Sequence, residues 1–253
     1  MAVNYYKTKL MKKYNEGREE FNPSYDEHHI KLFMNLLIVG KPGSGKTNQV
    51  LDIIHKMRGC FAKILIYTAN VTEPLYVMLQ DLLNVEGKNV VILEEIKRIP
   101  RLADLETGKM QQLVIIDDFI TQDKKILTKI EEYSIRGRQR LLTCCFLSQS
   151  YYACPIKIRC TIRYLCLLRI TDKKNLSMII STIASSIPDD ILTKCIKNAT
   201  LFELNVAVID LQAKSSNTIL RRNFGTDNYY ILEDENEEPI ANPVLFMEDG
   251  IKN

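Results

Sequence analysis

The segment from residue 40 to residue 47 constrains the fold of this chain more than any other. It reads Gly-Lys-Pro-Gly-Ser-Gly-Lys-Thr and has the spacing G-x-x-x-x-G-K-[ST] of a phosphate-binding loop. The apolar run at 36–39 predicts a buried strand before the loop. Apolar residues at helical spacing across 48–57 predict a helix after it. This context disfavours the alternative of a chance glycine-rich turn.

All eight residues of the loop are candidate phosphate-binding residues: Gly40, Lys41, Pro42, Gly43, Ser44, Gly45, Lys46 and Thr47. Amides at a helix N-terminus favour phosphate because they are unpaired donors at the positive end of the helix dipole. In such loops the lysine reaches the β- and γ-phosphates, and the hydroxyl that follows it ligates Mg²⁺. We therefore expect Lys46 to contact phosphate and Thr47 to hold Mg²⁺.

A second motif is the apolar run at 113–116, which ends in Asp117 and Asp118. Two acids at the end of a buried strand are costly unless they have a task. On a phosphate-binding sheet, an acid in this place holds Mg²⁺, so we assign that role to Asp117. Asp118 is then expected to orient or deprotonate the attacking water. The alternative is a strand followed by an Asp helix cap, which the upstream loop disfavours.

Gln149 and three arginines form a third group of candidates. Gln149 follows the predicted strand at 141–147, at the sheet edge where open α/β sheets bind ligands. Arg138 precedes this strand, and Arg159 and Arg163 follow it. Such arginines can stabilise transition-state charge, often from a neighbouring subunit, or bind a phosphate backbone. The sequence leaves both roles open.

Strands and helices alternate along most of the chain. Further strands are expected at 63–67, 89–93, 141–147, 164–168 and 206–211, helices at 74–83, 124–135, 173–181 and 189–197, short helices within 94–110, and a polar connection at 150–162. This alternation predicts an α/β fold with a mainly parallel sheet and helices on both faces. We expect an N-terminal arm at 1–30, one domain at 31–225 and an acidic tail at 226–253.

Charge is unevenly distributed along the chain. Residues 123–174 hold twelve basic and four acidic side chains, whereas 226–253 hold eight acidic and one basic. This pattern indicates either a polyanion-binding surface with a docking tail or two solvated faces.

Seven cysteines without a C-x-x-C pair indicate neither a zinc site nor a disulfide framework, which suggests a reducing, intracellular compartment. We expect no signal peptide and no membrane span.

In their order along the chain, these features resemble the genome-packaging ATPases of poxviruses and other large DNA viruses. Those proteins belong to the FtsK–HerA class of P-loop ATPases, which is RecA-like in fold. The resemblance covers about 33–183 and is carried by the loop at 40–47, the strand ending in Asp117 and Asp118, the Gly137-Arg138 pair before a strand ending at Gln149, and Arg159.

The resemblance implies an ATP- and Mg²⁺-dependent motor that moves double-stranded DNA into a preformed capsid. It also implies a homo-oligomeric ring with nucleotide between subunits, a capsid or portal protein as partner, and a place in the host cytoplasm, viral factory or virion. By similarity, Gln149 is a sensor of the γ-phosphate and Arg159 the preferred arginine finger, with Arg163 and Arg138 behind it. The family often has His where this chain has Gln139, so residues 139–140 receive no role.

Other interpretations remain. One is a helicase or replication ATPase of RecA or AAA+ type, and another is a P-loop scaffold that binds nucleotide to assemble with a capsid. The scaffold is disfavoured because it need not keep Lys46, Asp117 and Asp118. A nucleotide kinase or a GTPase is a weaker interpretation. The sequence shows neither the arginine-rich lid of a kinase nor the Asn-Lys-x-Asp base-reading loop of a GTPase.

Overall fold

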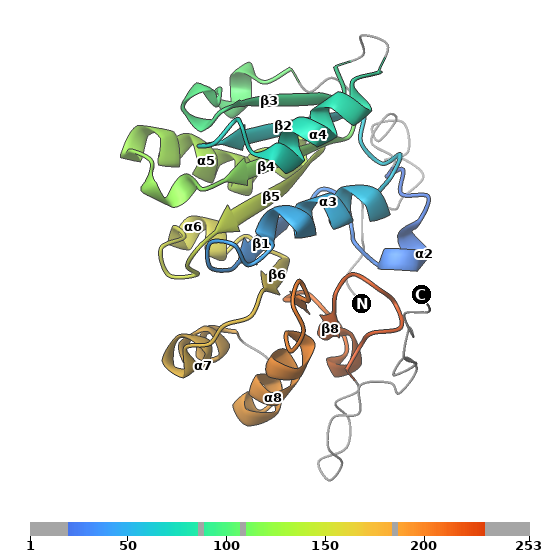
Figure 1. Ribbon diagram of the computed structural model, residues 1–253, viewed down its shortest axis with the longest axis vertical. Coiled ribbons are helices and arrows are strands. Elements are labelled where there is room, and N and C mark those ends of the chain that lie inside the picture. The colour runs from blue at the N-terminus through green and yellow to red at the C-terminus, as the bar shows by residue number, and fades with distance from the viewer. Residues whose placement is uncertain (1–19, 86–88, 107–109, 184–186, 231–253) are drawn as a thin grey trace, which may run out of the picture.

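The computed structural model describes residues 20–85, 89–106, 110–183 and 187–230. Within them, eight strands form one sheet in the order β3-β2-β4-β5-β1-β6-β7-β8 (Figure 1). The pairs from β3 to β6 are parallel, and β7 and β8 add to β6 in antiparallel fashion. The predicted α/β fold with a mainly parallel sheet is confirmed.

The strands are β1 (Asn35–Val39), β2 (Lys63–Thr68), β3 (Val91–Glu95), β4 (Gln112–Asp117), β5 (Leu142–Ser148), β6 (Tyr164–Leu167), β7 (Ala207–Asp210) and β8 (Leu220–Arg222). The α-helices are α2 (Tyr25–His28), α3 (Lys46–Lys56), α4 (Pro74–Leu83), α5 (Lys124–Arg136), α6 (Ile156–Arg159), α7 (Lys173–Thr182) and α8 (Asp189–Ala199). Short 3₁₀ segments are η3 (Ile96–Arg98), η4 (Leu102–Asp104), η5 (Phe119–Thr121), η6 (Gly137–Arg140) and η7 (Ser216–Thr218).

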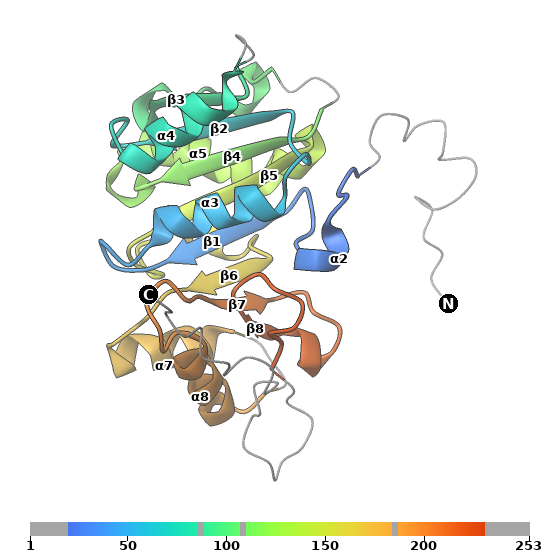
Figure 2. The same ribbon diagram turned by 45° about the vertical axis from the view of Figure 1, so that its right-hand side comes forward.

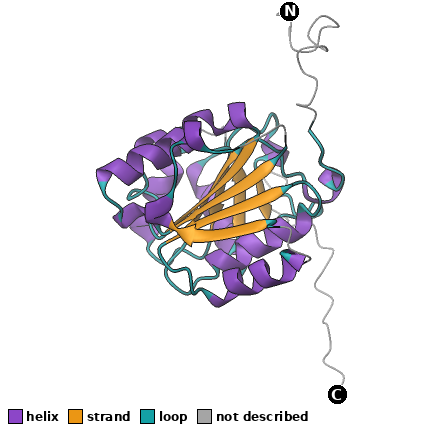
Figure 3. Cartoon of the chain, turned by 90° about the horizontal axis from the view of Figure 1, so that it is seen from above, coloured by secondary structure: helices purple, strands orange, loops and turns teal. Residues whose placement is uncertain are grey.

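Helices cover both faces of the sheet, as Figures 2 and 3 show. All five residues of β1 are buried, because successive side chains enter opposite cores: Leu36 and Ile38 enter one, and Leu37 and Val39 the other. Helices α3 and α4 pack on the first core, and α5 to α8 on the second. A strand that is buried on both faces reads as a continuous apolar run, which explains why the sequence revealed the central strands.

The structure adds three details to the predicted elements. The expected polar connection at 150–162 contains the one-turn helix α6, and the antiparallel strand β8 was not predicted. Residues 20–30 of the expected arm pack on the domain, since Ile30 is fully buried and the Phe21 amide donates to Gln111 Oε1 at 2.7 Å. Residues 1–19 and 231–253, which hold most of the expected arm and tail, lie outside the described residues.

The described part of the expected tail also lies against the domain. Tyr230 is buried, and its phenol donates to Asn198 Oδ1 at 2.8 Å. Across the described ranges, no helix has both the length and the apolar character needed to cross a bilayer.

Candidate nucleotide site

The phosphate-binding loop lies at the C-terminal end of β1, between the ends of β5 and β6. The Gly40 amide donates to Ser148 O at 3.1 Å, which ties the loop to β5. A Cβ on Gly40 would lie 2.7 Å from Leu168 Cδ1, so a side chain here would displace the residue that follows β6. Gly45 has φ of 92° and begins helix α3, a backbone conformation that residues with a Cβ avoid. The loop is therefore built closely against its neighbours.

Lys46 points back into the mouth of this loop. Its Nζ donates to Gly40 O at 2.9 Å and to Lys41 O at 3.1 Å. Burial lowers the pKa of Lys46, while Asp117 and Asp118 act in the opposite direction. The ammonium thus lies within the loop whose amides would bind phosphate, and on the side that faces the two acids.

Asp117 ends β4 and is held by a side chain that sequence reasoning missed. The phenol of Tyr76, on α4, donates to Asp117 Oδ2 at 2.9 Å. Burial raises the pKa of Asp117, and Tyr76 and Lys46 oppose that shift. The Thr47 side chain lies near the same phenol. A half-buried carboxylate beside a hydroxyl is a donor set that suits Mg²⁺, and a cation there would offset the cost of partly burying the charge.

Asp118 and Gln149 meet across the ends of two adjacent strands. Asp117 is opposite Leu147 in the β4–β5 register, which brings the residues after each strand together. Gln149 Nε2 donates to Asp118 Oδ1 at 3.1 Å. The backbone of Asp118 is left-handed, with φ of 54° and ψ of 44°. The structure therefore brings Lys46, Asp117, Asp118 and Gln149 to one edge of the sheet.

The three arginines are not in this cluster. Arg159 Nε donates to Cys154 O at 3.1 Å, and its guanidinium lies 5.0 Å from the ring centre of Tyr151 and 5.4 Å from that of Tyr152. Arg163 Nη2 forms an ion pair with Asp210 Oδ2 at 2.8 Å.

Arg163 and Arg138 line a separate cavity. Arg163 directly precedes β6, and Arg138 lies in η6 just before β5. This cavity therefore lies at the sheet edge opposite the phosphate-binding loop. These two arginines are therefore remote from the loop of their own chain.

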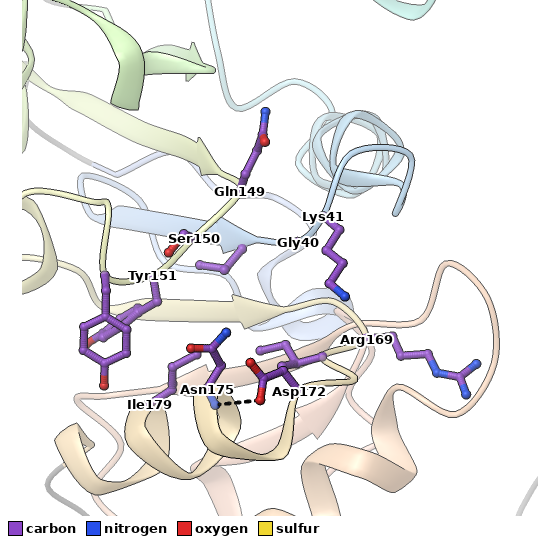
Figure 4. Close-up of a pocket in the computed structure, with 12 residues that line it drawn as sticks. Gly40, Lys41, Gln149, Ser150, Tyr151, Arg169, Asp172, Asn175 and Ile179 are labelled. Carbon is purple, nitrogen blue, oxygen red and sulfur yellow. Dashed lines mark hydrogen bonds between the residues drawn. The ribbon is translucent and has the colours of Figure 1, made fainter.

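A pocket extends the loop site toward β6 and α7 (Figure 4). Aromatic and aliphatic side chains line part of it, and polar groups line the rest: Tyr151, Tyr152, Ile170 and Ile179, with Gln149, Arg169, Asp172 and Asn175. Lys41 of the loop donates to Thr171 Oγ1 at 3.0 Å on its border. An apolar pocket with a few polar groups beside a phosphate-binding loop can accept the remainder of a nucleotide.

The segment between α8 and β7 supports the loop from the other side. Gln49 Nε2 donates to Leu204 O at 2.6 Å, although the two residues are 155 positions apart. A Cβ on Gly45 would lie 2.5 Å from Leu204 Cδ2, so Leu204 packs directly on the loop. No local pattern in the sequence pointed to this contact.

The fold and this cluster define the chain as a P-loop nucleotide-binding protein. Residues 24–198 match the family described as Poxvirus A32 protein, and the chain belongs to that family. The resemblance to poxvirus-type proteins inferred from the sequence is thereby confirmed. No curated protein matches the chain significantly.

Two solved structures of related fold are of proteins from viruses of Sulfolobus. One is the DNA-packaging ATPase B204 of Sulfolobus turreted icosahedral virus, with 15% identity, a TM-score of 0.53, and coverage of 77% of this chain and 98% of that one. Another is the genome-packaging NTPase B204 of Sulfolobus turreted icosahedral virus 2 in complex with AMPPCP, with 16% identity, a TM-score of 0.56, and coverage of 75% and 96%. At these identities the likeness establishes the P-loop fold.

Proposed function

We propose that this protein is an ATP-driven motor that translocates double-stranded viral DNA into a preformed capsid. The observation that carries the proposal is the cluster of Lys46, Asp117, Asp118 and Gln149 at one sheet edge. Together these residues supply a phosphate contact, a metal ligand and a base for water. Family membership and the named function of the B204 proteins support the choice of DNA packaging among P-loop activities.

Each residue of the cluster has a separate task. The amides of residues 40–47 and Lys46 bind the phosphates of ATP, and Thr47 and Asp117 hold Mg²⁺. When bound, the metal neutralises charge on the phosphates. Asp118 accepts a proton from the attacking water, and Gln149 keeps the Asp118 carboxylate directed at the site through its amide donor.

The proposed assembly is a homo-oligomeric ring with a nucleotide at each subunit boundary. Arg159 is the proposed finger for the adjacent subunit, because its guanidinium is oriented by two tyrosines on a segment that borders the pocket. Arg138 and Arg163 remain second candidates, from the opposite edge of the sheet. The proposed ATPase domain spans 31–225, and the described parts of the arm before it and of the acidic tail after it pack against it. The motor acts in the host cytoplasm or viral factory and meets a capsid or portal protein.

One experiment tests the motor. ATP hydrolysis by the purified protein is measured with and without double-stranded DNA, alongside its oligomeric mass. A ring whose hydrolysis rises with DNA supports the proposal, and a monomer whose turnover ignores DNA contradicts it. Stimulation by single-stranded DNA alone favours the helicase alternative. Nucleotide binding without turnover favours the assembly scaffold.

A further inference from the structure

We infer that Tyr76 is a positioning residue of the magnesium site, which orients Asp117 through its phenol hydroxyl. The inference rests on the proposed function, because it assigns a second layer of contacts to the same site. Tyr76 lies on α4, outside the strands and loop that carry the other site residues.

The contact of Tyr76 with the site is direct. Its side chain is fully buried, and its hydroxyl donates to Asp117 Oδ2 at 2.9 Å. The Thr47 side chain lies near the same phenol. Tyr76 therefore holds one of the two side chains proposed to bind the metal and lies beside the other.

This arrangement differs from that of other buried tyrosines in the described chain. Three of them donate to neutral groups: Tyr133 to Pro100 O, Tyr164 to His29 O, and Tyr230 to Asn198 Oδ1. A neutral carbonyl is enough to satisfy a buried phenol. In contrast, the partner of Tyr76 is a half-buried carboxylate, whose charge is disfavoured by burial.

The bond also determines which carboxylate oxygen remains for the metal. Tyr76 uses one acceptor site of Asp117 Oδ2, which would favour Oδ1 as the oxygen offered to a metal and restricts rotation of the carboxyl group. Partners of this kind, one contact removed from a metal, fix the orientation of the ligands, and their loss commonly weakens metal binding by about 10- to 100-fold. We expect the same order of effect at this site.

The test compares Tyr76→Phe with Tyr133→Phe. Both changes remove one hydroxyl from a fully buried tyrosine, but Tyr133 lies on α5 against the other face of the sheet. Mn²⁺ affinity is measured by electron paramagnetic resonance in the presence of a non-hydrolysable ATP analogue. Analogue affinity in EDTA and urea denaturation are measured in parallel. We expect the Mn²⁺ Kd of Tyr76→Phe to rise about tenfold or more, with analogue affinity in EDTA unchanged and Tyr133→Phe like wild type.

A third variant separates positioning from packing. Replacement of Tyr76 with 4-aminophenylalanine keeps a donor at the para position that can reach Asp117, and we expect this variant to bind Mn²⁺ more tightly than Tyr76→Phe. Wild-type Mn²⁺ affinity in Tyr76→Phe overturns the inference. So does a loss that follows stability alone in all three variants, or a Tyr76→Phe chain that does not fold. If the wild-type protein binds no ATP analogue, the proposed function itself fails, which is a distinct outcome.

Discussion

Replacing Asp118 with Asn tests the hydrolytic mechanism most directly, because the structure predicts what the change leaves intact. Asp118 has left-handed backbone angles, with φ of 54°. Asn is one of the few residues besides Gly that adopts this conformation readily. Its side-chain oxygen can also accept the hydrogen bond that Gln149 Nε2 now makes with Asp118 Oδ1 at 3.1 Å. The variant should therefore keep the local geometry and lose only the basic carboxylate.

The expected loss is large in rate and small in stability. A positioned general base contributes about 10²- to 10⁴-fold to rate, which corresponds to about 3–5 kcal/mol of activation free energy. Stability should change by no more than about 0.5 kcal/mol, the usual range for a half-exposed site whose contacts are kept. Nucleotide affinity should be unchanged, because Asp118 has no proposed contact with the phosphates.

The assay is single-turnover ATP hydrolysis, combined with analogue binding and urea denaturation. Asp118→Ala is the matched variant, because it removes the same carboxylate but disfavours the left-handed backbone. We expect it to lose turnover equally and to lose about 1 kcal/mol of stability as well. Turnover of Asp118→Asn within threefold of wild type would refute the assignment and move the base to another residue. Equal stability of the two variants would refute the argument from backbone conformation.

Three further changes test other parts of the structure. Lys46→Ala should abolish ATP hydrolysis. Circular dichroism should show an unchanged fold, because the two hydrogen bonds of Lys46 reach only loop carbonyls. Hydrolysis at the wild-type rate would show that the loop is not the phosphate site. Arg159→Ala should lose activity and regain it in mixed rings with Lys46→Ala subunits, whose arginine is intact, and no recovery would exclude a finger at Arg159. Burial and Arg221 lower the pKa of His28 to about 4, so His28 stays neutral when folded. The unfolded chain takes up its proton first as pH falls from about 6.5 to 4, which should remove about 3 kcal/mol of stability. Urea denaturation at pH 7 and pH 4.5 measures this loss of stability, which should be smaller in His28→Asn. An equal loss of stability in that variant would show that His28 does not cause it.

The parallel part of the fold could be predicted because the residues that identify it lie in contiguous segments of the sequence. Central strands buried on both faces are apolar throughout, and the phosphate-binding loop is a contiguous segment. The strand β8 escaped prediction because two of its three residues are arginines. Arg221 is nevertheless only 2% exposed, since its guanidinium lies over the rings of Phe224 and Tyr229 and donates to His28 O at 2.6 Å. A charged residue type at position 221 therefore gave no sign that this side chain is buried.

The site also has residues that the sequence predicted and one that it did not. Asp117 ends β4, Asp118 and Gln149 directly follow β4 and β5, and Lys46 belongs to the loop after β1. The rule that ligands bind at one sheet edge therefore predicted their neighbourhood. Tyr76 is 41 positions from its partner Asp117, on a helix where any apolar residue would satisfy the pattern. Its phenol could not be assigned before the fold was known.

Because Gln49 contacts Leu204, cleavage of the chain near residue 204 would disturb the nucleotide site. The segment after α8 is solvent-exposed, with Leu201 56% and Phe202 53% exposed, so a protease can reach it. Cleavage there would leave every residue of the phosphate-binding loop in place but release the backbone oxygen that Gln49 holds and the side chain that covers Gly45. The nicked protein should bind ATP more weakly, and bound ATP should slow the cut. The rate of proteolysis at 201–204 therefore reports whether the phosphate-binding loop holds a nucleotide.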